Sequence, residues 1–571
     1  MYILGLSAMG HDPAAALVGD RGIIAAIEEG KLTRSRSTEG IPRDAIRFCL
    51  DRAGIAWRDL DRIAIASRPT RAWSRNLLFR ARLAPLAPAS SAYFMNKASG
   101  DLGRELNNFR ILRGMAGAPK TRIEALDHHL CHAASAFFAS PFDRALITTL
   151  DERGDSRTGF AGLGIGSQIH EIASLALPHS LAWVFSQVTS LLGFRPHSDE
   201  HKTQWLSLVG EPAYLDLFLE MLRRAPQGEP HLNSSYFQRG FAIELSFAPR
   251  FYQRLGIQDA KDPHLDEKLR ANVAASLQQA CATIVTEWLA SLRLQTGEKN
   301  LCLAGGLFLN PLLVAAIEQT AGFEKVFIQP AAGNEGTSLG AAWLAWHQTQ
   351  GRPRLEPLSS LYCGPSYSNE DIKQVLDNCK ASYRWCDSED RTIEEALRLL
   401  YAGKTLAWFQ GAAEFGPRAL GHRSLLASPW APYVKENLND YVKHRESFRP
   451  FALAIPSEDC PEYFECSANG RFMTTMARAK EKAAQLLGSP QQGFLSKDNL
   501  VRLHIVTFDS NPLLWKLLKR SGEKSPAAML VNTSFNLFGE PLVVTPRDAV
   551  RSYFCSGTDA LIAGSFLLAK R

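Results

Sequence analysis

Three histidines stand within five residues in the stretch DHHLCHAASA, which runs from Asp127 to Ala136. If this stretch is helical, His128 and His132 share one face, whereas His129 points about 100° away. Paired histidines at this spacing can bind one metal cation. The alternative is a partly solvated helix start in which Asp127 is the N-cap. These residues alone leave both interpretations open.

A second group of candidate residues consists of cations placed among Gly, Pro and apolar residues near the C-terminus. A solvated charged surface would be richer in polar residues, so these cations beside the strand-like PFALAI predict a site for a phosphate or a nucleotide. For Arg445, an ion pair with the neighbouring Glu446 is the alternative. The five cations are Arg418, Arg423, Lys443, Arg445 and Arg449.

Further groups for such a ligand are expected in VNTSFNLFGEPLVV, where Asn532, Thr533 and Ser534 lie between a strand and a turn. Glycine turns in NLCLAGGLFLNPLL and KVFIQPAAGNEGTSLGAAWLAW each follow a strand and precede a helix. Backbone at such turns can approach a phosphate closely, and the helix N-terminus adds positive charge. Any tight strand–helix turn also favours glycine, but two in succession favour nucleotide binding. The candidate contacts are Gly305, Gly306, Asn310 and Gly333.

Two sets of strands and helices are needed to position these residues. YILGLS, AAALVGD and GIIAAIEE alternate like a three-strand meander with a polar loop, GHDP, at its first turn. A second start at 144 places Asp151 at the end of the strand ALITTL, which predicts a duplicated nucleotide-binding fold. GRPRLEP at 351–357 is the expected linker to a second α/β domain. Helices are predicted over 43–53 and 266–293, and the Arg-rich segment 68–122 is predicted to be a helical insertion.

Composition restricts the function classes further. The chain has 571 residues and a net charge of +6, which is too small for its length to indicate a nucleic-acid partner. The ten cysteines include no C-x-x-C pair and are expected to be buried thiols of a reducing compartment. The N-terminus lacks a signal-peptide pattern, and no apolar run reaches membrane-spanning length. We therefore expect a cytoplasmic protein with no membrane partner, and a homodimer is left open.

Together these segments resemble the O-carbamoyltransferase family of nodulation protein U, cephalosporin carbamoyltransferase and tobramycin carbamoyltransferase. The resemblance implies an α/β fold: a duplicated actin-like ATPase (ASKHA) domain over 1–352, similar to the tRNA threonylcarbamoyl transferase subunit, and a YrdC-like domain over 353–571. It implies that the second domain converts carbamoyl phosphate and ATP, with Mg, into carbamoyladenylate and pyrophosphate. The first domain then passes the carbamoyl group to an acceptor hydroxyl. The matching stretches include HDPAAALV, HHLCHAASAFF, TLDERGD, AGGLFLN, PAAGNEGTSLGAA, FGPRALGHRS, NDYVKHRESFRPFA and NTSFNLFGEPLVVTPRDA.

The resemblance also implies roles for single residues. His128, His132 and Asp151 would hold a divalent metal, with iron the expected ion. Asn334 stands where the family usually has a ligating Asp, and its uncharged oxygen puts the affinity and identity of the metal in question. His11 would accept the proton of the acceptor hydroxyl as a neutral imidazole. The residues expected at carbamoyl phosphate and the ATP phosphates are Arg418, Lys443, Arg449, Arg502, Asn532 and Ser534.

The departures from the family pattern surround the expected transfer pocket, so the acceptor is predicted only as a small-molecule hydroxyl of a sugar or natural product such as an antibiotic. A threonylcarbamoyl-type tRNA-modifying enzyme is one alternative, against which the small net charge argues. A non-catalytic nucleotide-binding scaffold is another, which Asn334 and the changes in 198–208 make conceivable. The departing residues are Glu152, Arg153, Gln204, Trp205 and Ser207, and KDNLVR keeps Asp498 and Arg502 but lacks a histidine.

Overall fold

The computed structural model divides the chain into two compact units. The N-terminal unit comprises Met1–Ile24, Glu39–Ile46 and Leu50–Pro357, and the C-terminal unit comprises Ala25–Thr38, Arg47–Cys49 and Leu358–Arg571. Most of the predicted helical insertion at 68–122 lies outside the described residues. The structure describes residues 1–8, 11–36, 38–68, 102–103, 106–115, 117, 121–225, 228–238, 247–350, 352–488 and 493–570.

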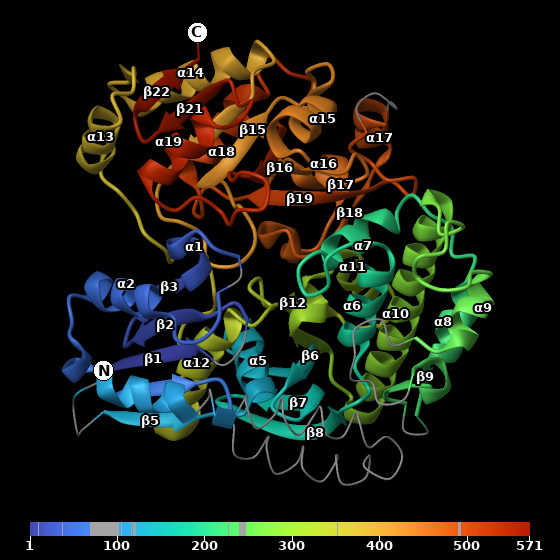
Figure 1. The fold of residues 1–571 in the computed structure, drawn as a ribbon. Coiled ribbons are helices and arrows are strands. Elements are labelled where there is room, and N and C mark those ends of the chain that lie inside the picture. The colour runs from blue at the N-terminus through green and yellow to red at the C-terminus, as the bar shows by residue number, and fades with distance from the viewer. Residues whose placement is uncertain are drawn as a thin grey trace. The chain divides into compact units, whose positions relative to one another are not determined.

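The N-terminal meander is present as predicted and forms one side of a five-stranded sheet of order β3-β2-β1-β4-β5, with β1 at its centre (Figure 1). Strand β1 pairs antiparallel with β2 and parallel with β4, and β4 pairs parallel with β5. Strand β2 is buried along its whole length, which explains its continuous apolar sequence. The strands are β1 (Tyr2–Ser7), β2 (Ala14–Gly19), β3 (Gly22–Glu28), β4 (Arg62–Ile65) and β5 (Arg122–Ala125).

A second five-stranded sheet repeats this plan in the order β8-β7-β6-β11-β12. Again the first strand in the chain is central, antiparallel to the second and parallel to the fourth. The predicted duplication is therefore confirmed. Strand β6 does not end at Asp151 as expected but continues to Gly154, with a shift in register after Leu150. The strands are β6 (Arg144–Gly154), β7 (Arg157–Ile165), β8 (Gln168–Ala176), β11 (Asn300–Ala304) and β12 (Lys325–Ile328).

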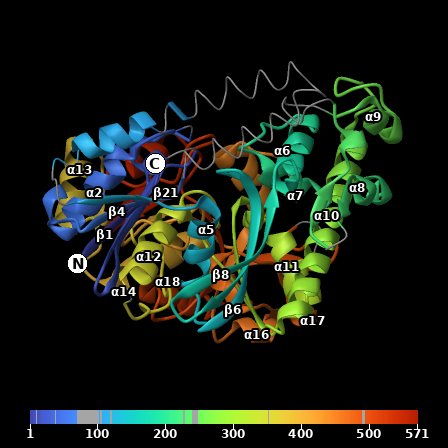
Figure 2. The ribbon, with the colours of Figure 1, turned by 90° about the horizontal axis from the view of Figure 1, so that it is seen from below.

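Helix α12 (Gly336–Gln350) packs against α5 (His128–Phe137) and strand β1 (Figure 2). A Cβ atom at Gly340 would lie 1.8 Å from the Cys131 carbonyl, and one at Gly5 would lie 1.9 Å from the Ser338 carbonyl. Close packing therefore explains the small residues of this helix. The helices predicted over 43–53 and 266–293 are also present. The other elements are α2 (Arg43–Ala53), α6 (Leu181–Leu191), α7 (Glu200–Leu206), α8 (Leu215–Met221), α9 (Pro249–Leu255), α10 (Glu267–Thr296), α11 (Pro311–Thr320), β9 (Leu222–Arg224) and β10 (Pro230–Leu232).

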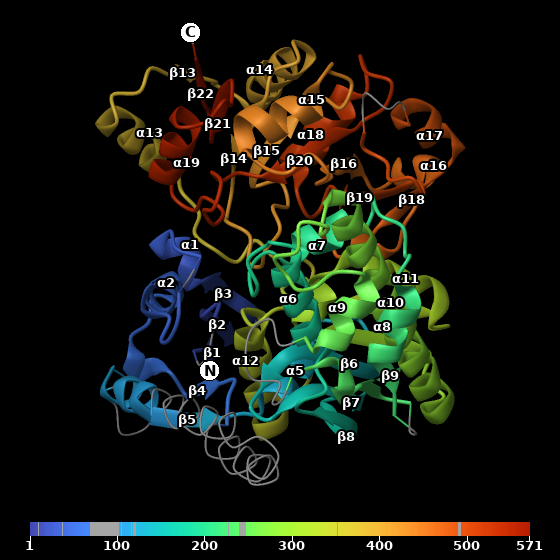
Figure 3. The same ribbon diagram turned by 45° about the vertical axis from the view of Figure 1, so that its right-hand side comes forward.

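The C-terminal unit is built on a ten-stranded mixed sheet of order β13-β22-β21-β14-β15-β20-β16-β19-β18-β17 (Figure 3). Alternate residues of its strands face opposite sides, so that Leu425 and Leu453 join one apolar core and Leu426 and Ala454 the other. The predicted second α/β domain is thus present. Its strands are β13 (Arg384–Trp385), β14 (Leu406–Phe409), β15 (Arg423–Ala427), β16 (Ala452–Pro456), β17 (Phe464–Glu465), β18 (Ala477–Ala479), β19 (Leu500–Val506), β20 (Leu530–Ser534), β21 (Ala560–Ala563) and β22 (Phe566–Ala569).

Helices cover both faces of this sheet. The first core includes residues of α13 and α19, and the second includes residues of α14 and α18. The segment Glu29–Thr33, helix α1, precedes them in the chain and is counted with this unit. The helices are α13 (Asn369–Asn378), α14 (Glu389–Tyr401), α15 (Val434–Glu436), the π-helix η4 (Asn437–Lys443), α16 (Cys460–Tyr463), α17 (Glu481–Leu487), α18 (Pro512–Ser521) and α19 (Pro546–Phe554).

All ten cysteines are free thiols, but the expectation that they are buried is wrong for Cys379 and Cys555, which are exposed. Cys363 and Cys466 are partly exposed, and the other six are buried. No helix within the described part of the chain is long and apolar enough to cross a membrane.

Candidate metal and phosphate sites

Helix α5 begins at the triple-histidine stretch, and Asp127 caps it by accepting a hydrogen bond from the Leu130 amide at 3.1 Å. His129 and His132 are fully buried, whereas His128 keeps 13% of its side chain exposed. The N-cap of the alternative interpretation is thus present, but most of the histidine cluster faces the interior. His129 turns away from its two neighbours and is hydrogen-bonded to the Thr149 hydroxyl at 2.8 Å.

The structure brings His128, His132 and Asp151 together, with one potential ligand atom from each lying within 4.8 Å of the others. Asp151 Oδ2 lies 3.5 Å from His128 Nε2 and 3.1 Å from His132 Nε2. His128 Nδ1 donates to the Ala66 carbonyl at 3.3 Å, which leaves the lone pair on Nε2. The buried atoms His128 Nε2 and His132 Nδ1 have no hydrogen-bond partner among the described residues. This donor set fits a divalent metal ion.

The electrostatics favour the ligand-competent forms of Asp151 and His132 but the protonated form of His128. Burial raises the pKa of Asp151, but the contacts and charges of His128 and His132 outweigh burial and hold this pKa well below its usual range. Burial lowers the pKa of His132 and so favours the neutral imidazole. Burial also lowers the pKa of His128, but Asp151 more than offsets this and raises it. Metal binding at such a site releases the proton that the carboxylate stabilises.

Asn334 lies beside His11 in the N-terminal unit. Asn334 Nδ2 is 3.1 Å from His11 Nε2, and the buried Asn334 Oδ1 has no hydrogen-bond partner within the described ranges. His11 Nδ1 is 2.7 Å from Asp12 Oδ2. Desolvation lowers the pKa of His11, but the hydrogen bond and charge of Asp12, with the charges of Asp151 and Glu152, raise it to about 9. This corrects the expected neutral imidazole, because the acidic neighbours favour the protonated ring.

Sequence reasoning missed one polar pair near His11. Glu152 Oε2 lies 2.7 Å from His197 Nδ1, and both side chains are partly exposed. The charges of His11 and His197 act on one another, so the pair lies within electrostatic range of His11. Glu152 was recognisable as a departure from the family pattern. His197 was not, because it is 45 residues away and belongs to no motif.

Lys443 ends the π-helix η4 and is buried beside the last residue of β20. Its Nζ donates to the Ser534 carbonyl, to Ser534 Oγ at 3.3 Å and to Asn536 Oδ1 at 2.8 Å. The loop after β20 thus holds the ammonium group. The sequence predicted that Ser534 follows a strand, but Ser534 is the last residue of β20 itself. Asn536 was missed because nothing in its local sequence links it to Lys443.

Strand register places Arg502 and Asn532 on either side of Ala452. Directly paired residues project from the same face of a sheet, so these two side chains share a face. Asn532 Nδ2 donates to the Ala419 carbonyl at 3.2 Å and contacts His504 Nδ1 at 3.0 Å. Asn532 therefore supports the loop that carries Arg418.

Arg445 and Arg449 differ in their partners. Arg445 Nε donates to Asn439 Oδ1 at 2.8 Å, and its guanidinium lies 4.2 Å from the centre of the Phe451 ring. Glu446 pairs with Arg449 at 3.7 Å. The structure therefore pairs Glu446 with Arg449, and the charge of Glu446 also acts on Arg445.

Five cations of the C-terminal unit act on one another, and we call them the cation cluster: Arg418, Lys443, Arg445, Arg449 and Arg502. Burial and then the charges of Arg445, Arg449 and Arg36 hold the pKa of Lys443 well below its usual range. Burial and the charges of three cluster arginines likewise lower the pKa of Arg502. Burial and Arg449 lower the pKa of Arg445 to about 9, although Glu446 opposes this. Such mutual repulsion is relieved by a multiply charged anion.

The sequence of the chain matches two family models. A family model described as carbamoyltransferase N-terminus matches residues 2–343, and one described as carbamoyltransferase C-terminus matches residues 397–570. The chain belongs to the carbamoyltransferase family. This carbamoyltransferase is 34% identical over 600 aligned residues to an uncharacterised protein of Synechocystis sp., which covers 100% of the chain and 97% of that protein.

Two further similarities complete the comparison. Nodulation protein NolNO of Sinorhizobium fredii is 31% identical to this carbamoyltransferase, over 98% of the chain and 79% of that protein. Component A of the (R)-2-hydroxyglutaryl-CoA dehydratase of Acidaminococcus fermentans is a solved structure at 14% identity. The match covers 61% of this chain and 99% of the chain of that structure, with a TM-score of 0.32.

Two predicted contacts of the carbamoyltransferase with phosphate or nucleotide are contradicted. Arg423 is fully buried, donates to the carbonyls of Gln410, Gly411 and Pro365, and stacks 3.8 Å from the centre of the Phe409 ring. Its guanidinium thus serves the fold. Asn310 caps α11 through Oδ1 and donates from Nδ2 to Gln278 at 2.7 Å, so both ends of its amide have internal partners.

The predicted glycine contacts have a packing explanation. Gly305 has a φ of 100°, and a Cβ atom there would lie 2.3 Å from the Leu150 carbonyl. A Cβ atom at Gly306 would lie 3.0 Å from Asp151 Oδ1, so this glycine leaves room beside a candidate metal ligand. At Gly333 it would lie 2.4 Å from Glu335 Oε2. Close packing thus accounts for these glycines, and nucleotide contact at them stays a prediction.

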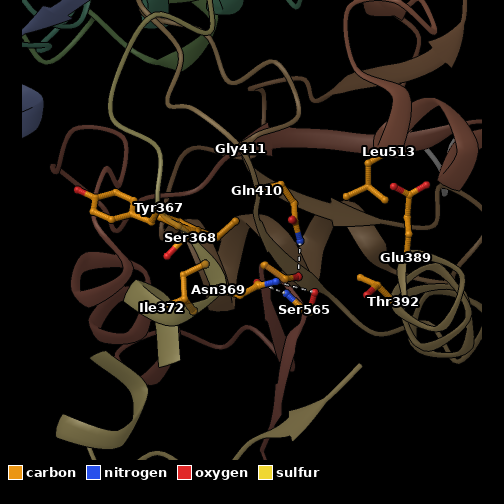
Figure 4. Close-up of a pocket in the computed structure, with 12 residues that line it drawn as sticks. Tyr367, Ser368, Asn369, Ile372, Glu389, Thr392, Gln410, Gly411, Leu513 and Ser565 are labelled. Atoms are coloured by element: carbon orange, nitrogen blue, oxygen red, sulfur yellow. Dashed lines mark hydrogen bonds between the residues drawn. The ribbon is translucent and has the colours of Figure 1, made fainter. Parts of the chain in front are cut away.

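A cavity of about 370 Å³ opens elsewhere in the C-terminal unit of the carbamoyltransferase, at the end of β14 (Figure 4). Asn369 Nδ2 donates to Ser565 Oγ at 3.3 Å, and Gln410 Nε2 donates to the Gly564 carbonyl at 2.9 Å. The described residues that line the cavity include no lysine or arginine. Polar groups paired with each other and without positive charge do not complement a phosphate, so the cation cluster is the better candidate.

Proposed function

We propose that this enzyme is an ATP-dependent O-carbamoyltransferase that uses carbamoyl phosphate through a carbamoyladenylate. The observation that supports it best is the cation cluster, in which each of five cations lies within electrostatic range of others and Arg449 is paired with Glu446. Carbamoyl phosphate and the triphosphate of ATP, with Mg, are anions of the charge that this cluster would neutralise. The domains proposed for the two reactions are residues 353–571 for adenylate formation and 1–352 for transfer.

In the first reaction, water hydrolyses carbamoyl phosphate to carbamate and inorganic phosphate. A carbamate oxygen then attacks the α-phosphorus of ATP, and the bond to pyrophosphate breaks. Negative charge increases on the departing pyrophosphate, where fixed cations stabilise the transition state. Lys443 is oriented for this role, because Ser534 and Asn536 hold its ammonium group.

In the second reaction, the acceptor oxygen attacks the carbamoyl carbon, and the bond to AMP breaks. In its neutral form, reached by losing the proton that its acidic neighbours stabilise, His11 is proposed to receive the hydroxyl proton on Nε2, with Asp12 orienting its ring through Nδ1. His128, His132 and Asp151 would hold the divalent metal, proposed to be iron, with Asn334 as a fourth ligand. When bound, the metal would polarise a carbonyl oxygen as a Lewis acid. The proposed acceptor is a small-molecule hydroxyl of a sugar or natural product.

The proposed first reaction predicts that pyrophosphate release from ATP requires carbamoyl phosphate. The test supplies ATP, Mg and either carbamoyl phosphate or inorganic phosphate to the full chain and follows pyrophosphate. Release only with carbamoyl phosphate supports the proposal. Equal release with inorganic phosphate, or none with either, would contradict it.

Asn334→Asp is expected to tighten metal binding. The buried Asn334 Oδ1 has no hydrogen-bond partner among the described residues, and a carboxylate at this position adds the charge that a divalent ion favours. The measurement is competition with a chelator of known affinity, using Fe²⁺ and Zn²⁺ separately. Gln204→Glu, a buried amide-to-acid change on α7, is the control for non-specific charge effects. An unchanged affinity in Asn334→Asp would show that Asn334 is not a ligand.

A further inference from the structure

A short segment near the N-terminus of the chain is built into the C-terminal unit. We call it the arm, residues 28–36, comprising the last residue of β3, helix α1 and three following residues. Lys31 is buried, and its Nζ donates to the carbonyls of Glu414 at 2.7 Å and Gly416 at 2.6 Å. Glu28 pairs with Lys31 at 2.9 Å and accepts from the Gly416 amide at 2.8 Å. The arm thus anchors the loop that leads to Arg418.

The same arm holds the loop that carries Asn536. Arg36 donates from Nε and Nη2 to the Glu540 carbonyl at 3.1 and 2.9 Å. Asn536 Nδ2 donates to this carbonyl at 2.7 Å. Arg34 adds a contact to Glu540 Oε2 at 2.9 Å and donates to the Leu542 carbonyl at 2.5 Å. One backbone carbonyl therefore receives hydrogen bonds from both the arm and Asn536.

These contacts form a continuous path to the candidate catalytic lysine. Arg36 fixes the Glu540 carbonyl, this carbonyl orients Asn536 through Nδ2, and Asn536 Oδ1 accepts from Lys443 Nζ at 2.8 Å. We propose that the arm is a positioning element of the C-terminal site, in which Arg36 acts through Asn536 to set the place of the Lys443 ammonium. Its catalytic consequence rests on the proposed adenylate-forming function. Residues near position 30 are therefore required for chemistry at residues beyond 400.

A double-mutant cycle in the full chain tests this path. Arg36→Ala should reduce kcat for pyrophosphate release about tenfold or more, because small misplacements of catalytic groups are costly. Asn536→Ala should reduce it at least as much, and the double variant should be no worse than Asn536→Ala. Arg36→Lys should fail to restore the rate, because a lysine cannot donate two N–H groups from a planar fork. Arg58→Ala, an exposed arginine of the other unit, is the matched control.

Additive losses in the cycle, or full activity in Arg36→Lys, would overturn the proposal and show that Arg36 acts independently or through charge alone. Amide hydrogen exchange of residues 534–542 gives a readout that does not depend on activity. Arg36→Ala should exchange faster there than wild type and Arg58→Ala, and unchanged exchange would refute positioning by the arm. Faster exchange in an enzyme whose wild type releases no pyrophosphate would support the arm and reject the proposed function.

Discussion

Lys443→Ala is expected to lower carbamoyl phosphate-dependent pyrophosphate release by roughly 100- to 1,000-fold, the usual cost of losing one preorganised donor at a developing charge. Lys443 is buried, and its ammonium group is held by Ser534 and Asn536. Its fixed position means that the donor group is in place before the reaction begins. The measurement is the rate of pyrophosphate formation at saturating ATP and carbamoyl phosphate.

Two further variants separate this effect from loss of structure. Lys443→Met keeps most of the apolar volume and should be as inactive as Lys443→Ala. Lys373→Ala, an exposed lysine of α13, should keep normal activity. Thermal unfolding of each variant shows whether the chain remains folded. Normal pyrophosphate release in a folded Lys443→Met variant would mean that the lysine stabilises the loop and takes no part in the chemistry.

Much of the fold could be predicted from the sequence because the signals were local. The alternating segments at 2–28 and 144–176 each encode three antiparallel strands, and the sheets formed around them repeat one strand order. The boundary of the C-terminal unit was harder to predict from the sequence. Residues 25–38 continue from a strand of the first sheet but make contacts with residues 414 and 540, which no local pattern reveals.

The candidate metal ligands were predictable for the same reason, since His128 and His132 lie on one helix face. Arg418 and Arg423 show where such reasoning fails. Both stand in one basic segment, but Arg423 begins strand β15 and its guanidinium is fully buried among backbone carbonyls. Residue type and spacing could not distinguish a cation for a ligand from one that satisfies carbonyls, because burial is set by distant strands.

His11→Asn and Asp151→Asn are expected to block carbamoyl transfer and to leave pyrophosphate release intact. His11 is the proposed proton acceptor, and loss of a general base costs on the order of 100- to 10,000-fold in rate. Asp151 contacts both His128 and His132, so its neutral variant should also lose bound metal. All of these residues lie in the N-terminal unit, whereas the cation cluster lies in the C-terminal unit.

The measurement pairs pyrophosphate release with mass spectrometry of carbamoylated product, using a hydroxyl acceptor that the wild type modifies. His264→Asn, an exposed histidine of the same unit, is the control and should be active in both assays. Metal content distinguishes the two variants: Asp151→Asn should lose metal, and His11→Asn should retain it because His11 is not a proposed ligand. If His11→Asn also fails to release pyrophosphate while retaining its metal and fold, the two reactions are not divided between the units. Retained transfer in that variant would instead leave His11 as a residue that orients Asn334, with the hydroxyl proton passing to another base.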